Sequence, residues 1–227
     1  MIINDTLYKF NDEKLPANFV SIATKIEDNK PTHAAILIRY QDRNFLHHFP
    51  GATKPEVIAD FNEDGWFVYK IIDALSSSED EVGSILQYCN RICKNSNITY
   101  SYIADGSSYA DKGAFISKIG LPEFGTCVGF CTNTLTNTMI EIGDSYLNLD
   151  DWDDSDLLEH VDNWSIKQAQ KKYPDLDWTL YNAFKKRITP LEYLCSAFID
   201  EYPISKLKID EIKTTVQESI NNLFPTI

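Results

Sequence analysis

A cysteine and a histidine are the residues of this chain whose type and context best suit them for chemistry. Cys127 follows Gly125 and Thr126 and opens an apolar segment with helical spacing. At the start of a helix a thiol faces backbone N–H groups without intrahelical partners and the positive end of the helix dipole, and both favour the thiolate. Because the thiolate is the nucleophilic form, Cys127 is a candidate activated cysteine. His33, which opens the apolar run of residues 34–38, is the candidate general base.

A third polar group must orient the imidazole of such a pair. His47 and His48 lie on the segment that is expected to return beside His33 in a hairpin. Side chains alternate between the two faces of a strand, so only one of these two neighbours can lie beside His33. We prefer His47, which shares a face with Phe45, and keep His48 as the alternative.

A structural role is the alternative for each of these residues. A cysteine on the inner face of a helix is often a core residue, and Cys131, one turn after Cys127, indicates that this helix accommodates buried cysteine. His33 by itself is compatible with a hydrogen-bonded histidine at the end of a strand. Chemistry is the better interpretation only if the fold brings the thiol and the imidazole together.

Hydrophobic patterning predicts an α+β chain that would position these residues. The expected strands are Thr32–Tyr40, Phe45–Phe49 and Trp66–Ile72, with a polar turn at Gln41–Asn44, and Phe19–Ile26 is compatible with a short strand or helix. The expected helices before Gly143 are Glu79–Cys93, capped by the preceding serines, and Cys127–Ile142, with the extended segment Ile98–Tyr102 between them. After Gly143, four helical segments predict a helical C-terminal region: Leu157–Tyr173, Trp178–Lys186, Pro190–Asp200 and Ile209–Leu223.

Three short motifs resemble those of a known enzyme family. Cys127-Val128-Gly129-Phe130 resembles the Cys-Ser-Gly-Phe signature of NlpC-type papain-like amidases. The run His-Ala-Ala-Ile-Leu-Ile at 33–38 is similar to the His-Val-Gly-Ile strand of that family, and Phe45-Leu46-His47 resembles its following Met-Ile-His segment. The histidine strands precede the cysteine helix here, which is the order of the circularly permuted branch that includes YiiX-like proteins and the lecithin retinol acyltransferase group. The resemblance spans residues 32–142, with valine in place of the usual serine at 128.

The resemblance implies a permuted papain-like fold and a cysteine-dependent amidase or peptidase that forms an acyl-enzyme intermediate. Cys127, His33 and His47 would be the catalytic residues. These families place a helix and then a tyrosine ahead of the cysteine, which implies that Tyr100 lies on the oxyanion side. A catalytic domain is expected over 1–143 and a helical extension packed on it over 144–227. A lipid or thioester acyl hydrolase or acyltransferase, and a catalytically inactive papain-like binding module, are the alternatives.

The net charge of the chain limits the classes of partner that it is expected to bind. Its 227 residues carry a formal net charge of −13, which argues against general binding to nucleic acid or to an anionic membrane surface. The N-terminus lacks the features of a signal peptide, and no apolar run approaches the roughly 18 residues of a membrane span. We therefore expect a cytoplasmic protein without stable membrane insertion, with export by a route without a cleaved signal as the alternative. The expected partner is an amide- or ester-containing substrate: a peptide, a peptidoglycan fragment or an acyl lipid.

Neither a metal nor a cofactor is expected. The chain has five cysteines, an odd number that argues against a disulfide framework. Cys89 and Cys93 are four residues apart, as are Cys127 and Cys131, which suits one helix face in each case. Structural zinc sites usually draw such pairs from short knuckles, and neither pair has a neighbouring histidine. Acyl transfer through a cysteine needs no cofactor.

Overall fold

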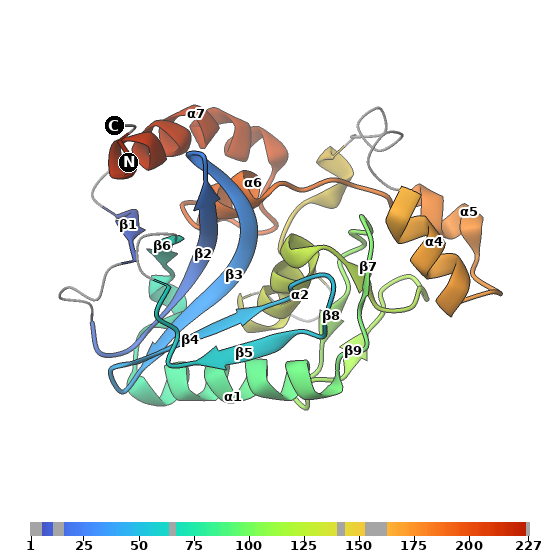
Figure 1. The fold of residues 1–227 in the computed structure, drawn as a ribbon, viewed down its shortest axis with the longest axis horizontal. Helices are drawn as coiled ribbons and strands as arrows, with labels where there is room; N and C mark the ends of the chain where they lie inside the picture. The colour runs from blue at the N-terminus through green and yellow to red at the C-terminus, as the bar shows by residue number, and fades with distance from the viewer. Residues whose placement is uncertain (1–5, 11–15, 64–66, 140–143, 153–162, 226–227) are drawn as a thin grey trace.

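The computed structural model describes residues 6–10, 16–63, 67–139, 144–152 and 163–225, and shows an α+β architecture (Figure 1). Its centre is a six-stranded antiparallel sheet in the order β1-β6-β2-β3-β4-β5. The strands of this sheet are β1 (Tyr8–Lys9), β2 (Phe19–Glu27), β3 (Lys30–Tyr40), β4 (Arg43–His48), β5 (Glu56–Ala59) and β6 (Phe67–Ile71). Two small sheets pair β7 (Thr99–Tyr100) with β10 (Phe124–Gly125), and β8 (Ser108–Tyr109) with β9 (Phe115–Ile116).

Helices flank the sheet and form most of the C-terminal region. They are η1 (Asp73–Leu75), α1 (Glu79–Asn95), α2 (Cys127–Met139), η2 (Leu149–Asp151), α4 (Asn163–Lys172), α5 (Trp178–Ala183), α6 (Pro190–Ser196) and α7 (Lys206–Leu223). The α+β class and the helical C-terminal region are confirmed. The segment 157–162 of the expected third helix, and residues 140–142 of the expected cysteine helix, lie outside the described residues.

Tight turns join the central strands. Asp28 and Asn29 connect β2 to β3, and Gln41 and Asp42 connect β3 to β4, all with positive φ. Two central residues with positive φ match the right-handed twist of the flanking strands. The expected four-residue connection at Gln41–Asn44 is therefore wrong, because β4 begins two residues earlier than the apolar pattern suggested.

The sheet separates two apolar layers. On one face, Ile22 and Ile36 pack in a large core with residues of α1, α2 and α6, among them Val82, Phe130 and Leu194. On the other face a smaller cluster gathers side chains that alternate with these: Phe19, Ala23, Ala35, Leu37, Leu46 and Tyr69. The twofold alternation of strand side chains thus supplies both layers.

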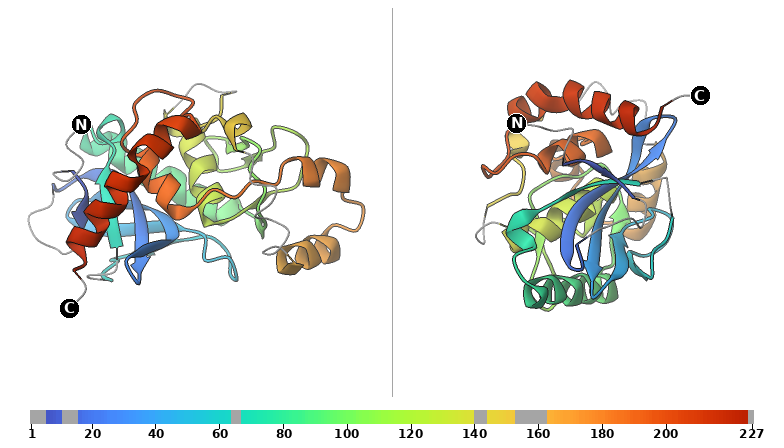
Figure 2. Two further views of the ribbon diagram at one scale, coloured as in Figure 1. Left: turned by 90° about the horizontal axis from the view of Figure 1, so that it is seen from above. Right: turned by 90° about the vertical axis from the view of Figure 1, so that its left-hand side faces the viewer.

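The C-terminal helices lie in two places. Helix α6 packs on β2 and β3, and α7 lies outside α6 (Figure 2). Tyr193 of α6 is completely buried and donates a hydrogen bond from its hydroxyl to the carbonyl of Ala35 at 3.2 Å. Helices α4 and α5 lie at the far end of the molecule and form a third apolar cluster with Phe124, which precedes α2 (Figure 2). Both groups therefore contact the segments that carry the candidate site.

No helix in the described part of the chain is both long and apolar enough to cross a bilayer. The longest helices, α1 and α7, have one buried face and one exposed polar face instead.

Replacement of Leu194 by alanine is expected to lower the free energy of unfolding by about 2–5 kcal/mol, because this side chain is fully buried between α6 and the sheet. Leu207→Ala in α7 is the matched control, since Leu207 is 70% exposed and its truncation should change stability by less than about 0.5 kcal/mol. Chemical denaturation measures both. Equal stabilities for the two variants would show that α6 is not part of the main core.

Candidate functional site

Cys127 is the first residue of α2, as its sequence context predicted. Strand β10 delivers the chain to this point by pairing in parallel with β7, with Gly125 opposite Tyr100. Thr126 then caps the helix: its hydroxyl oxygen accepts the N–H of Gly129 at 3.2 Å, and its carbonyl accepts the N–H of Phe130 at 2.9 Å. The helix start is thus fixed by a capping threonine.

The Cys127 thiol is surrounded by backbone donors. The N–H groups of Cys127 itself, Val128 and Ala34 are directed at its sulfur and lower its pKa, but burial has the larger effect and raises the pKa above its ordinary value. The expectation that the helix start makes this thiol acidic is therefore wrong, since removing a thiolate from water costs more than these donors return. Burial raises the pKa of the other thiols too: to about 12 for Cys93 and Cys195, and well above the ordinary value for Cys89 and Cys131.

Ala34 links the cysteine to the candidate base. The β3–β4 ladder ends at the pair Ala35 and His48, so the backbone of Ala34 lies just past the end of β4, where the thiol contacts it. His33 is the next residue along the strand. No hydrogen bond joins Cys127 to the His33 imidazole among the described residues. The His33 side chain lies on the face of the sheet that carries Ala35 and Leu37, whereas α2 packs on the face of Ala34 and Ile36, so the thiol contacts the strand through the backbone of Ala34 and not through the imidazole.

The partner of His33 is His48. Nε2 of His33 lies 3.0 Å from Nδ1 of His48, and the two rings meet edge to face at 89°. Burial, followed by the proximity of His48 and Lys25, lowers the pKa of His33 to about 4. His33 is therefore a neutral imidazole at pH 7, able to accept a proton but not to act as a resting counter-ion for a thiolate.

His47, preferred from the sequence as the neighbour of His33, points to the opposite face of the sheet. The pairs Ala35–His48 and Ile36–His47 put the odd-numbered residues of β3 on the same face as the even-numbered residues of β4. His33 therefore shares a face with His48. His47 is completely buried in the main core, with its ring 4.7 Å from that of Phe130.

His47 belongs to a second thiol–imidazole pair that the sequence did not reveal. Its Nδ1 lies 3.3 Å from Sγ of Cys93, and its Nε2 lies 3.1 Å from the hydroxyl of Thr134. That hydroxyl donates its hydrogen to the carbonyl of Phe130, so it must accept from Nε2–H of His47. Nδ1 is then the acceptor for the Cys93 thiol. Burial lowers the pKa of His47 to about 3 and raises that of Cys93 to about 12, so both groups are neutral and the pair satisfies polar atoms inside the core.

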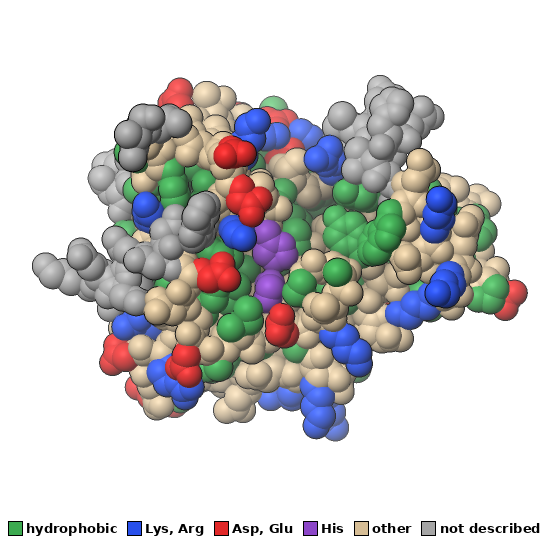
Figure 3. Space-filling view, viewed as in Figure 1, with side chains coloured by type: hydrophobic (Ala, Val, Ile, Leu, Met, Phe, Trp, Pro, Cys, Tyr) green, Lys and Arg blue, Asp and Glu red, His purple; other side chains and the backbone are tan. Residues whose placement is uncertain are grey.

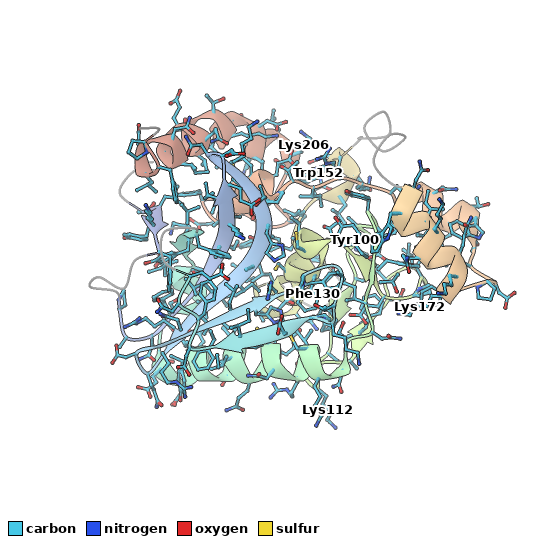
Figure 4. All side chains as sticks on the ribbon, viewed as in Figure 1. Tyr100, Lys112, Phe130, Trp152, Lys172 and Lys206 are labelled. Carbon is cyan, nitrogen blue, oxygen red and sulfur yellow. The ribbon has the colours of Figure 1, made fainter. Side chains whose placement is uncertain are left out.

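Tyr100 lies between α2 and α4 (Figure 4). Its ring contacts those of Phe49, Tyr102 and Trp164 with centroid distances of 6.2, 5.9 and 5.9 Å. Together with the half-exposed Trp164 it lines a pocket of about 390 Å³. The tyrosine implied by the family resemblance is thus beside the strand that leads to Cys127.

The surface over this region combines imidazole, acidic and apolar groups. Histidine side chains reach the surface near the middle of the face shown in Figure 3, with acidic side chains beside them and an apolar area toward α4. No group of three or more histidine, cysteine, aspartate or glutamate side chains within the described ranges is arranged to hold a metal ion. The described side chains of this region offer a thiol with backbone N–H donors at the start of α2 and a pair of imidazoles on the opposite face of the sheet.

Acidification should destabilise the protein through His47. Its pKa is about 3 when folded and near 6.5 when unfolded, so the unfolded chain binds the proton first and the free energy of unfolding falls as the pH drops below about 6.5. This histidine contributes at most about 1.4 kcal/mol per pH unit in that window and nothing above it. His47→Gln should have a shallower slope between pH 6.5 and 4 in urea denaturation, whatever its stability at pH 8. Parallel slopes for both proteins would contradict the buried neutral imidazole.

Comparisons with known proteins do not assign a family or a function to this chain. The chain matches no protein-family model, no curated protein and no solved structure. The function of the site is therefore argued from its own residues.

Proposed function

We propose that this protein is a cysteine hydrolase of the amidase or peptidase type, with Cys127 as nucleophile, His33 as general base and His48 as the group that orients His33. The observation that supports this most is the convergence of three elements: the start of α2, the start of β3 and the end of β4. The thiol of Cys127, at the capped start of α2, lies beside the backbone of Ala34. Ala34 follows His33, whose imidazole is hydrogen-bonded to His48. In this proposal the three side chains would serve as nucleophile, base and orienting group, the set that covalent acyl transfer requires.

The proposed reaction starts from neutral partners. His33 would take the proton of the Cys127 thiol as the sulfur attacks the carbonyl carbon of an amide or ester. The tetrahedral intermediate would then lose its amine or alcohol, which leaves with the proton from His33, and water would release the acyl group by the reverse sequence. Catalytic hydrogen bonds often form only in the substrate complex. The proposed role requires the His33 side chain, which in the free protein lies on the sheet face opposite α2, to turn past the end of β4 toward the thiol.

The groups around the thiol also suit the charge that develops on the carbonyl oxygen. The backbone N–H groups of Cys127 and Val128 point toward the sulfur from the start of the helix, where they have no intrahelical acceptors. Donors fixed in this way can stabilise an oxyanion without rearrangement. Tyr100, opposite Gly125 in the β7–β10 pair, is the proposed side-chain contributor or the wall of the substrate pocket.

Two observations favour a second candidate, an inactive papain-like binding module. The Cys127 thiol is not hydrogen-bonded to His33, and burial raises its pKa. In that case the pocket beside Tyr100 and Trp164 would bind a ligand without chemistry. Thiol reactivity separates the two candidates.

Cys127 is expected to be the most rapidly alkylated thiol of the folded protein. It is only partly buried and its sulfur faces several backbone donors, whereas Cys89, Cys131 and Cys195 are buried. Brief treatment with iodoacetamide at pH 7.5, read by peptide mass spectrometry, measures the order of labelling. Faster labelling of Cys195 or Cys93 would remove the basis for the nucleophile.

His33→Ala should slow the alkylation of Cys127 by about tenfold or more, because the base that accepts the thiol proton is lost. His48→Ala should slow it less, since His48 acts through the orientation of His33. The labelling rate of Cys195 in the same samples is the internal control and should not change. An unchanged Cys127 rate in a folded His33→Ala variant would leave the binding module as the better description.

A further inference from the structure

We propose that Glu56 is a positioning residue that fixes the protonated nitrogens of His48 and His33, and thereby leaves Nδ1 of His33 as the basic atom. The inference rests on the proposed function for its consequence, but the protonation pattern can be measured without it. Glu56 is on β5, a strand that the sequence did not predict.

The three side chains form a line across neighbouring strands. Glu56 is directly opposite His48 in the β4–β5 ladder, and its Oε1 lies 3.6 Å from Nε2 of His48. The other nitrogen of His48, Nδ1, lies 3.0 Å from Nε2 of His33. His48 therefore has one nitrogen toward a carboxylate and the other toward an imidazole.

Proton positions follow from what each atom can donate or accept. An ionised carboxylate only accepts, so the nitrogen of His48 that faces it, Nε2, is the one that carries hydrogen. In the neutral ring Nδ1 of His48 is then an acceptor. Nε2 of His33 must supply the hydrogen of the 3.0 Å bond, which leaves Nδ1 of His33 with a free lone pair. The carboxylate of Glu56 thus determines, through His48, which nitrogen of His33 is basic.

Other charged groups near the histidines do not replace Glu56. Lys25 and Glu27 face His33, but they form an ion pair with each other at 3.3 Å. Glu63 also acts on His48 through its charge, without a hydrogen bond or ion pair to it in the described structure. Nε2 of His48 is buried and makes no hydrogen bond within the described structure, and the carboxylate of Glu56 lies 3.6 Å from it.

The first test measures the tautomers directly. Long-range ¹H–¹⁵N correlation spectra at pH 7 distinguish the two neutral forms of each histidine, and single histidine variants assign the signals. In the wild type, both His48 and His33 should carry hydrogen on Nε2. Glu56→Gln keeps an acceptor oxygen and should preserve this pattern, whereas Glu56→Ala should produce a mixture for both rings. Glu63→Gln is the matched control and should leave the spectra unchanged.

The second test follows the consequence for the cysteine. Glu56→Ala should slow the alkylation of Cys127 by on the order of tenfold, the effect typical of a group that orients a functional histidine. Glu56→Gln and Glu63→Gln should stay within about twofold of the wild type. Because Glu56 is about half exposed, with 54% of its side chain accessible, these variants are expected to fold.

The outcomes separate the two proposals. Hydrogen on Nδ1 of His48 in the wild type, or unchanged tautomers in Glu56→Ala, would overturn the role of Glu56. If the tautomers respond as expected but His33→Ala leaves the alkylation of Cys127 unchanged, the positioning role stands and the catalytic function fails. If His33→Ala slows alkylation and Glu56→Ala does not, the catalytic function stands and the role of Glu56 fails.

Discussion

The pairing of β3 with β4 is the constraint on which the candidate site depends. The pair Ala35–His48 ends the ladder, which leaves the backbone of Ala34 free of β4 and in contact with the Cys127 thiol. The same register puts His48 beside His33 and sends His47 into the core. A shift of the β3–β4 register by one residue would exchange the faces of His47 and His48. It would break both the His33–His48 contact and the His47–Cys93 contact.

Burial shifts the pKa values of the thiols and imidazoles in the same directions around Cys93 and around Cys127. Each charged form would lose hydration, so burial lowers the pKa of both His33 and His47 and raises that of Cys93 and Cys127. The two thiols differ in their side-chain neighbours and in the backbone N–H donors around the sulfur. His47 is closed in the core with Cys93 and Thr134, whereas Cys127 stands at a helix start with backbone N–H groups around it. The first arrangement satisfies polar atoms inside the core, and the second is the one on which the proposed acyl transfer depends.

The helices after Gly143 contribute to the same structure. Helix α6 covers the sheet behind the site, and Tyr193 ties it to the carbonyl of Ala35, the residue whose partner is His48. At the other side, Trp164 of α4 contacts Tyr100 beside the approach to Cys127. The position of β3 and the shape of the neighbouring pocket therefore both depend on segments far away in the sequence.

Local patterns in the sequence determined the α+β class, the start of α2 at Cys127, the cap of α1 and the helical C-terminal region. Capping residues, apolar periodicity and turn chemistry act over a few neighbours, so they can be read from a single chain. They also identified His33 and a histidine on the next strand as a pair. Only the tertiary structure decided that the partner is His48, that Glu56 stands behind it, and that Cys93 lies against His47. Those contacts depend on strand register and on packing between distant segments, and burial of the thiol outweighed the local effect of the helix start on its pKa.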